Sequence, residues 1–269
     1  MTVPTNLTLL RYGLAAGGLV ALALIEQARP FRAWRDPRLS RLARNLFLAA
    51  SNAAIAEIAL GGSLVAMSAW LAAPANGWGL LRILGAGRLA NIVASLICLD
   101  LATYLFHRAY HEVPVLWRLH RVHHADRDLD VTSASRFHAG EILLSSLYRL
   151  ALMPLLGPSY EAVVVFEIAL AAAAQFQHAN LKLGDRFDRA LRWLTVTPDM
   201  HRVHHSKVVE ATNSNYATIF SIWDRLFASY RVEGIDQQTI DIGLADYARP
   251  EDVTLGRLVA MPFTRPPAA

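Results

Sequence analysis

Hydrophobic residues fall into four long stretches separated by shorter polar segments. Residues 7–25, 46–73 and 89–106 are almost continuously apolar. Each is close to or longer than the ~20 residues that a helix needs to cross a bilayer. A fourth stretch, 142–176, is broken at Gly157-Pro158 into pieces that are short for a span. The pattern predicts three spans and then a tilted or re-entrant helical hairpin that returns the chain to the side it left.

Composition supports this interpretation. Apolar residues make up 54% of the 269-residue chain and charged residues 18%. In soluble domains apolar residues make up about 45–50% and charged residues about 25%. We therefore expect an all-α integral membrane bundle, with residues 1–90 as anchor helices and an arginine-rich loop. Residues 91–230 would form the catalytic region, and 231–269 a soluble tail.

Charge patterning indicates the orientation. Residues 29–44 hold six arginines in sixteen positions, and they follow the first apolar stretch. Arginines in short loops mark the cytoplasmic side, and this order does not fit a signal peptide. The net charge of +4 is spread between apolar stretches, which argues against a nucleic-acid partner. The predicted topology places 107–141 and 178–269 on the cytoplasmic side. The Ala-, Arg- and Leu-rich composition favours a bacterial plasma membrane. Residues 185–194 would form a helix lying in the interface.

The five letters HRVHH occur twice, at 120–124 and 201–205, and all histidines lie in the part expected to face the cytoplasm. On a helix, positions i, i+3 and i+4 share a face, whereas adjacent residues diverge by about 100°. One histidine of each His-His pair can therefore reach one metal ion while its neighbour reaches another. An ion takes about four to six ligands, so ten imidazoles indicate two ions. The ten are His107, His111, His120, His123, His124, His138, His178, His201, His204 and His205.

Other interpretations fit less well. A histidine-rich surface tract would be contiguous, and a zinc protease would need H-E-x-x-H, whereas arginine follows the first histidine here. A haem needs only one or two axial histidines. The single cysteine, Cys98, excludes a disulfide within the chain and a cysteine-based zinc site. A membrane metal-binding or transport protein stays as the alternative, although Asp100 is its one plausible intramembrane ligand.

The segments HRAYH, LHRVHH, SRFHAGE, QHAN, HRVHH and NSNYATIFSIWDRLFASY together resemble the fatty acid hydroxylase / sterol desaturase superfamily. Its members are integral membrane enzymes with a histidine-bound di-iron centre that uses O2. The resemblance covers about residues 100–230 and implies that the histidines of HRAYH and of both HRVHH copies ligate iron. His178 matches a further ligand after the hairpin. His138 stands in HAGE, where the family more often has H-P-x-E, as a ligand or as support for one.

Three further residues are candidates for catalytic roles. Asp100 lies on one helical stripe with Tyr104 and His107 and would accept a hydrogen bond from a ligand imidazole. Glu141 would do similar work, with Asp126 and Asp199 as weaker candidates. Asn215 belongs to the closing motif of the family with Asn213, Tyr216 and Asp224, where helix capping is an equally good explanation. Trp117, Trp193 and Trp223 are expected to anchor at the interface.

A di-iron centre at the membrane surface suits oxidation of an unactivated C–H bond in a fatty acyl, alkyl or sterol-like chain, by hydroxylation or desaturation. No segment resembles a haem or flavin domain, so electrons would come from a separate ferredoxin- or cytochrome-type reductase.

Overall fold

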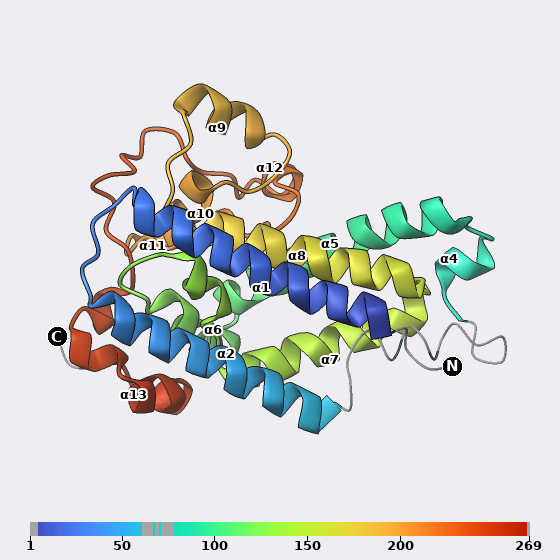
Figure 1. Cartoon of the computed structure of the whole chain (residues 1–269), viewed down its shortest axis with the longest axis horizontal. Helices are drawn as coiled ribbons and strands as arrows, with labels where there is room; N and C mark the ends of the chain where they lie inside the picture. The colour runs from blue at the N-terminus through green and yellow to red at the C-terminus, as the bar shows by residue number, and fades with distance from the viewer. Residues whose placement is uncertain (1–4, 61–66, 68–69, 71–77, 268–269) are drawn as a thin grey trace.

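The computed structural model describes residues 5–60, 67, 70 and 78–267. Within these residues the chain is helical and has only two isolated β-bridges, between Thr195 and Phe220 and between Ser206 and Ile242. Part of the predicted second stretch, from residue 61 on, lies largely outside the described residues. The expected all-α membrane bundle is confirmed for the described part (Figure 1).

Four of the described helices are long and apolar enough to cross a membrane. They are α1(Thr5–Ala28), α5(Arg88–Glu112), α7(Ala139–Leu156) and α8(Tyr160–His178). The first two confirm the spans predicted at 7–25 and 89–106, and the last two are the predicted hairpin. Helix α2(Arg38–Leu60) starts inside the arginine run, eight residues before the apolar stretch that continues it.

The hairpin opens like a V toward the end of the molecule that holds the histidines. Gly157 ends α7 in the left-handed conformation, with φ 70°, and the Ser159 hydroxyl accepts from Ala162 N to begin α8. From this turn the two helices diverge (Figure 1). Helix α7 packs on α2 and α5, whereas α8 packs on α1 and α5. At the narrow end Gly79 approaches so closely that a Cβ on it would lie 2.2 Å from Gly157 N.

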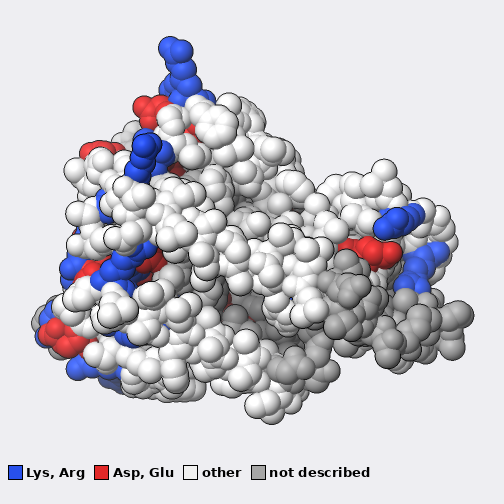
Figure 2. Space-filling view, in the orientation of Figure 1, with Lys and Arg blue, Asp and Glu red and all other residues white. Residues whose placement is uncertain are grey.

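Charged side chains are concentrated at the two ends of the long axis. On the face shown in Figure 2, lysine, arginine and acidic residues gather at the end that carries α9(Asp185–Leu191), and a smaller group lies at the opposite end. On this face the described surface between them is almost entirely uncharged. Such a belt is what a protein crossing a bilayer presents to lipid. Phe187 and Leu194 of the predicted interfacial segment are exposed at the charged end.

Short elements cover the histidine end of the bundle. Those that carry or support the site are α6(Pro114–His124), η2(Val131–Ser135), α10(Pro198–His204), α11(Val209–Thr212) and α12(Ile222–Leu226). The C-terminal residues form η3(Ala245–Tyr247), η4(Pro250–Val253), α13(Leu255–Ala260) and η5(Met261–Phe263). They pack on α6 and α2 through a core that joins Val122 and Leu48 to Tyr247, Leu258 and Met261. The predicted tail thus lies against a histidine-bearing helix.

Candidate metal centre

Four helices bring nine of the ten histidines together. Helix α5 contributes His107 and His111 from its last two turns, and α8 contributes its final residue, His178. The two HRVHH copies lie at the C-terminal ends of α6 and α10, each begun by a proline in the first turn. Proline is favourable there because backbone N–H groups in the first turn have no acceptor within the helix, so the missing N–H of proline costs no hydrogen bond.

The nine histidines divide into two groups, and the ligand atoms of each group lie within 4.8 Å of one another. We call them the five-histidine group and the four-histidine group. The first consists of His107, His111, His120, His124 and His204, and the second of His123, His178, His201 and His205.

The repeated segments contribute to both groups in opposite proportions. The first copy gives its first and last histidines, His120 and His124, to the five-histidine group and His123 to the other. The second copy gives His201 and His205 to the four-histidine group and His204 to the five-histidine group. Each copy therefore offers an i, i+4 pair to one group and a single imidazole to the other.

Backbone carbonyls orient several of these rings through Nδ1. His107 Nδ1 lies 2.7 Å from Tyr216 O, His178 Nδ1 2.7 Å from Ala174 O, and His204 Nδ1 2.6 Å from Ser214 O. His123 Nδ1 lies 3.3 Å from Arg136 O. A carbonyl oxygen can only accept, so Nδ1 carries the proton in each ring and Nε2 presents a lone pair.

The Nε2 atoms converge in a way that fits a cation. His107 Nε2 lies 3.1 Å from His120 Nε2, and His178 Nε2 lies 3.1 Å from His123 Nε2. His120 Nδ1 faces Glu141 Oε1 at 2.7 Å. All four rings then donate through Nδ1, so lone pairs face each other in both contacts and repel unless a positive ion lies between them. Two nitrogens bound at about 2.1 Å to one ion are about 3.0–3.4 Å apart at octahedral to tetrahedral angles. The residues therefore fit two metal ions.

Burial keeps the imidazoles neutral, as metal ligation requires. It lowers the pKa of His120 to about 3. Burial and then the neighbouring imidazoles hold the pKa of His201 and His205 well below the usual value. Around neutral pH these rings can offer their nitrogens to a metal without first losing a proton.

The two groups differ in access. All residues of the four-histidine group are buried, whereas His107 and His111 of the five-histidine group are partly exposed. The His111 ring lies 5.0 Å from the Trp117 ring, and its Nδ1 lies 3.2 Å from Asn213 Oδ1. Trp117, which was expected to be an interface anchor, therefore contacts a ring of the five-histidine group.

Of the three predicted catalytic residues, only Glu141 contacts a histidine ring. Glu141 Oε1 accepts from His120 Nδ1 at 2.7 Å, so this carboxylate supports a candidate ligand directly. Asp100 contacts no histidine. Its carboxylate accepts from Ile219 N, Phe220 N and the Trp223 indole at 2.8–3.1 Å. It thus fixes the segment whose Tyr216 carbonyl orients His107.

Asn215 has a structural position. Its backbone has a positive φ of 52°, and its side-chain amide donates to Met200 O and Arg231 O. It joins α10 to the segment that follows α12 and lies behind the imidazoles. Asp199 binds Lys182 and Arg202, and neither contact involves a histidine.

His138 lies outside both groups. Its Nδ1 accepts from Gly140 N at 3.0 Å and caps α7, and its Nε2 donates to Val259 O at 3.2 Å. Both ring nitrogens are therefore engaged with backbone groups.

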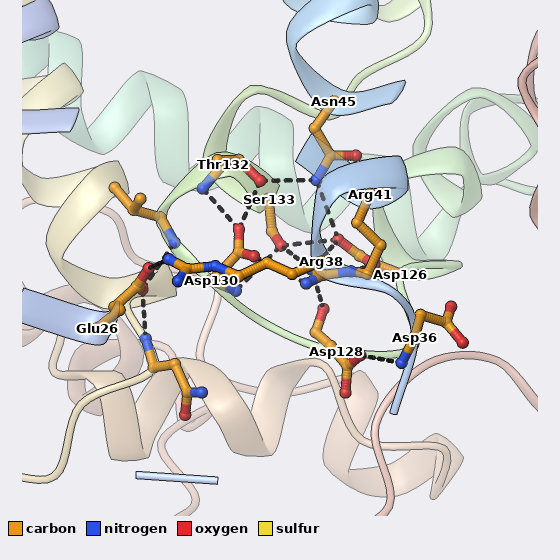
Figure 3. A network of polar contacts seen from close by, with 12 residues as sticks. Glu26, Asp36, Arg38, Arg41, Asn45, Asp126, Asp128, Asp130, Thr132 and Ser133 are labelled. Atoms are coloured by element: carbon orange, nitrogen blue, oxygen red, sulfur yellow. Dashed lines mark hydrogen bonds and ion pairs between the residues drawn. The ribbon is translucent and has the colours of Figure 1, made fainter. Parts of the chain in front are cut away.

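A buried ion-pair network behind the site was missed by the sequence reasoning. Arg41, which falls in the arginine run interpreted as a loop, is fully buried in α2 and binds Asp126 and Asp130 at 2.7–3.0 Å (Figure 3). Burial favours the neutral acid, but Arg41 and Arg136 hold the pKa of Asp126 well below its usual range. Arg136 in turn donates to Val122 O while its carbonyl faces His123. The aspartates at 126, 128 and 130 were the available signal, since such a cluster needs a cation if it is buried.

Glu26 of α1 supports the same region from the membrane side. Its carboxylate accepts from Val131 N at 2.9 Å and Asn180 N at 2.7 Å, which lie next to the network and to His178 (Figure 3).

Comparison with known proteins gives consistent matches. The sequence model of the fatty acid hydroxylase family matches residues 92–229, which include all ten histidines. The chain is 31% identical over 181 residues to ornithine lipid hydroxylase OlsE of Rhizobium tropici, covering 65% of the chain and 51% of that protein. It is 34% identical over 134 residues to the alkylglycerol monooxygenase of Xenopus tropicalis, covering 49% of the chain and 28% of the relative. A cholesterol 25-hydroxylase-like protein of Danio rerio is 27% identical over 145 residues, which are 53% of the chain and 56% of the relative.

The aligned part thus spans about half or less of the length of the first relatives. No solved structure matches the chain significantly.

Proposed function

The chain belongs to the fatty acid hydroxylase family, and from this premise we propose that it is an O2-dependent lipid hydroxylase with two iron ions. The observation that carries the proposal is the convergence of paired Nε2 lone pairs in two adjacent groups. Neutral imidazoles suit iron as ligands. When bound, the two irons would supply O2 activation for attack on an unactivated C–H bond.

The residues of the chain hold and orient this centre. The carbonyls of Tyr216, Ser214 and Arg136 fix ring tautomers, and the Glu141 carboxylate raises the basicity of the His120 imidazole. Burial of the four-histidine group excludes water from that side. The partly exposed His107 and His111 leave the other side for the substrate.

We propose a lipid as the substrate and hydroxylation as the reaction. The relatives are named for hydroxylase and monooxygenase activities on an ornithine lipid, alkylglycerol and cholesterol. The uncharged surface in Figure 2 would admit a lipid from the bilayer, and the candidate span α5 carries His107 near its C-terminal end. A ferredoxin- or cytochrome-type reductase would supply electrons at the charged, cytoplasmic end.

Isotope-labelled O2 tests the proposal. Cells that produce the chain are grown with labelled O2, and their lipids are analysed by mass spectrometry beside cells that produce His123→Ala. We expect a lipid that carries one labelled oxygen atom in the first strain only. A product with a new double bond and no label would replace hydroxylation by desaturation. Metal uptake without any oxidised lipid would favour the transport alternative.

A further inference from the structure

A second polar site lies in the C-terminal segment, on the side of α6 that faces away from the two histidine groups. It is an open pocket of about 360 Å³. Its lining consists of Tyr247, Arg249, Asp252, Arg257, Ala260, Thr264, Arg265 and Pro267. None of these residues contributes to the metal centre.

The pocket carries an excess of positive charge. Three arginines line it against one aspartate. Asp252 is buried and binds Arg249 at 3.1 Å and Arg257 at 2.8 Å, which fixes both guanidiniums at the rim while leaving most of their N–H groups unused. Glu251, outside the lining, lies 3.7 Å from Arg249. Arg265 forms no hydrogen bond or ion pair with any described residue.

The floor of the pocket contains an unsatisfied polar atom. Tyr247 is 4% exposed, and its buried hydroxyl has no hydrogen-bond partner in the described part of the chain. A buried hydroxyl without a partner destabilises the folded chain. An acceptor oxygen on a ligand that reached this floor would remove the deficit.

The pocket lies beside the start of the candidate span α7. His138 caps the candidate span α7, and it contacts Val259 O at 3.2 Å and the Phe263 ring at a centroid distance of 5.9 Å. Val259 is 49% exposed and Phe263 74%. A short helix with exposed apolar residues on one side and arginines on the other is typical of a segment lying in the interface.

We propose that this pocket binds the phosphate group of an anionic phospholipid. A guanidinium can bind two phosphate oxygens at once through paired N–H groups. A phosphate therefore explains the cluster of arginines better than an apolar ligand does. The exposed Val259 and Phe263 would lie among the acyl chains of the same leaflet. They favour a lipid headgroup over a soluble phosphate.

The site is connected to the metal centre through the arginine of the first HRVHH copy. Arg121 donates to Met261 O and, at 2.7 Å, to Thr264 O, and its guanidinium lies 5.7 Å from the Tyr247 ring centroid. A lipid held by Thr264 and its neighbours therefore stabilises the segment on which α6 rests. The bound lipid adds stability to the folded chain because it does not bind the unfolded one.

Native mass spectrometry of the full, delipidated chain in detergent tests the proposal. The probes are phosphatidylglycerol and phosphatidylcholine with identical acyl chains. We expect tighter binding of phosphatidylglycerol and a higher unfolding temperature in its presence. Arg265→Gln, at an exposed and unpaired position, should weaken that binding about fivefold, and Arg257→Gln together with Arg265→Gln at least about tenfold. Tyr247→Phe should weaken binding without lowering the stability of the lipid-free chain.

Arg189→Gln on α9 is the matched control, because it removes one exposed arginine elsewhere at the charged end and should leave binding unchanged. Equal affinity for both lipids, or an equal loss in the control, would overturn the proposal. Displacement of phosphatidylglycerol by equimolar inorganic phosphate would assign the pocket to a soluble phosphate instead.

Discussion

His124 and His205, the last residues of the two HRVHH copies, stack on each other with ring centroids 4.4 Å apart and planes at 20°, yet they belong to different histidine groups. The stacked rings therefore lie where the two groups adjoin.

Adjacent histidines should therefore affect different ions. We expect protein purified from iron-replete cells to hold about two metal ions per chain. His204→Ala removes a ligand from the five-histidine group and His205→Ala one from the four-histidine group. Each should lower the metal content to about one ion or fewer and abolish lipid oxidation. Elemental analysis beside turnover measures both, and full metal content in either variant would remove that histidine from its group.

Glu141 should act through His120. Glu141→Gln keeps an oxygen acceptor but removes its charge, so the imidazole becomes less basic. Changes of this kind cost about 10–100-fold in metal affinity or activity. Glu161→Gln at the start of α8 makes the same chemical change at a half-exposed site away from the histidines and should leave both unaffected. Equal effects of the two substitutions would show that the His120 contact is unimportant.

Asp100 should contribute mainly to stability. Asp100→Ala leaves Ile219 N, Phe220 N and the Trp223 indole without their acceptor. At about 1–3 kcal/mol for each unpaired buried donor, the free energy of unfolding should fall by several kcal/mol. Asp100→Asn should lose less, since one amide oxygen remains. Thermal unfolding in detergent, before metal is added, measures the effect. Normal stability with poor metal binding would restore a direct role toward a ligand imidazole.

Asp224 should make stability depend on pH. It accepts from Tyr216 N at 2.8 Å and from the Ser229 hydroxyl at 2.8 Å, but burial raises its pKa to about 6. Between about pH 4 and pH 6 the Asp224 carboxyl therefore keeps its proton in the folded state, whereas in the unfolded state, where its pKa is near 3.8, it has released it. The contribution of Asp224 to the free energy of unfolding is complete below about pH 4. It falls as pH rises through 6, by at most about 3 kcal/mol.

Comparison with Asp224→Asn isolates this effect from other titrating groups. The stability advantage of the wild-type chain over the variant should shrink between pH 4.5 and pH 7. Urea unfolding at several pH values measures it, and a constant difference across this range would contradict the raised pKa.

The cytoplasmic orientation can be tested with single cysteines in a Cys98→Ser background. Ser40 and Gln238 lie at the histidine end and are exposed, and Arg88 is exposed at the start of α5. In intact cells an impermeant thiol reagent should label Arg88→Cys and spare the other two. The reverse pattern would place the metal centre outside the cell, away from a cytosolic reductase.

The sequence was sufficient for the spans because long apolar runs have few alternatives to crossing a bilayer. Helix geometry also predicted that the adjacent histidines of each His-His pair reach different groups, as His123 and His124 do. It did not predict which group each i+3 histidine joins. The partners of the rings could not be predicted in this way. Tyr216, Ser214 and Arg136 act through backbone carbonyls, so their side chains carry no signal for the role.

Asp100 and Arg41 show a second limit. Asp100 has the correct helical register for a histidine contact, but loop 216–223 packs against it and supplies three donors. Arg41 has the sequence context of a solvated loop. Its burial depends on Asp126 and Asp130, which follow it in the chain by 85 and 89 residues. Both outcomes are set by long-range packing, which local patterns do not record.

Each HRVHH copy contributes histidines to both groups, and this has a thermodynamic consequence. The first ion to bind would pin α6 to α10 and would so order most of the nitrogens that a second ion needs. The conformational entropy lost on ordering would fall mainly on the first event, and a second ion would therefore bind more tightly. In a titration with limiting metal we expect chains that are mostly empty or doubly occupied, and few that hold a single ion.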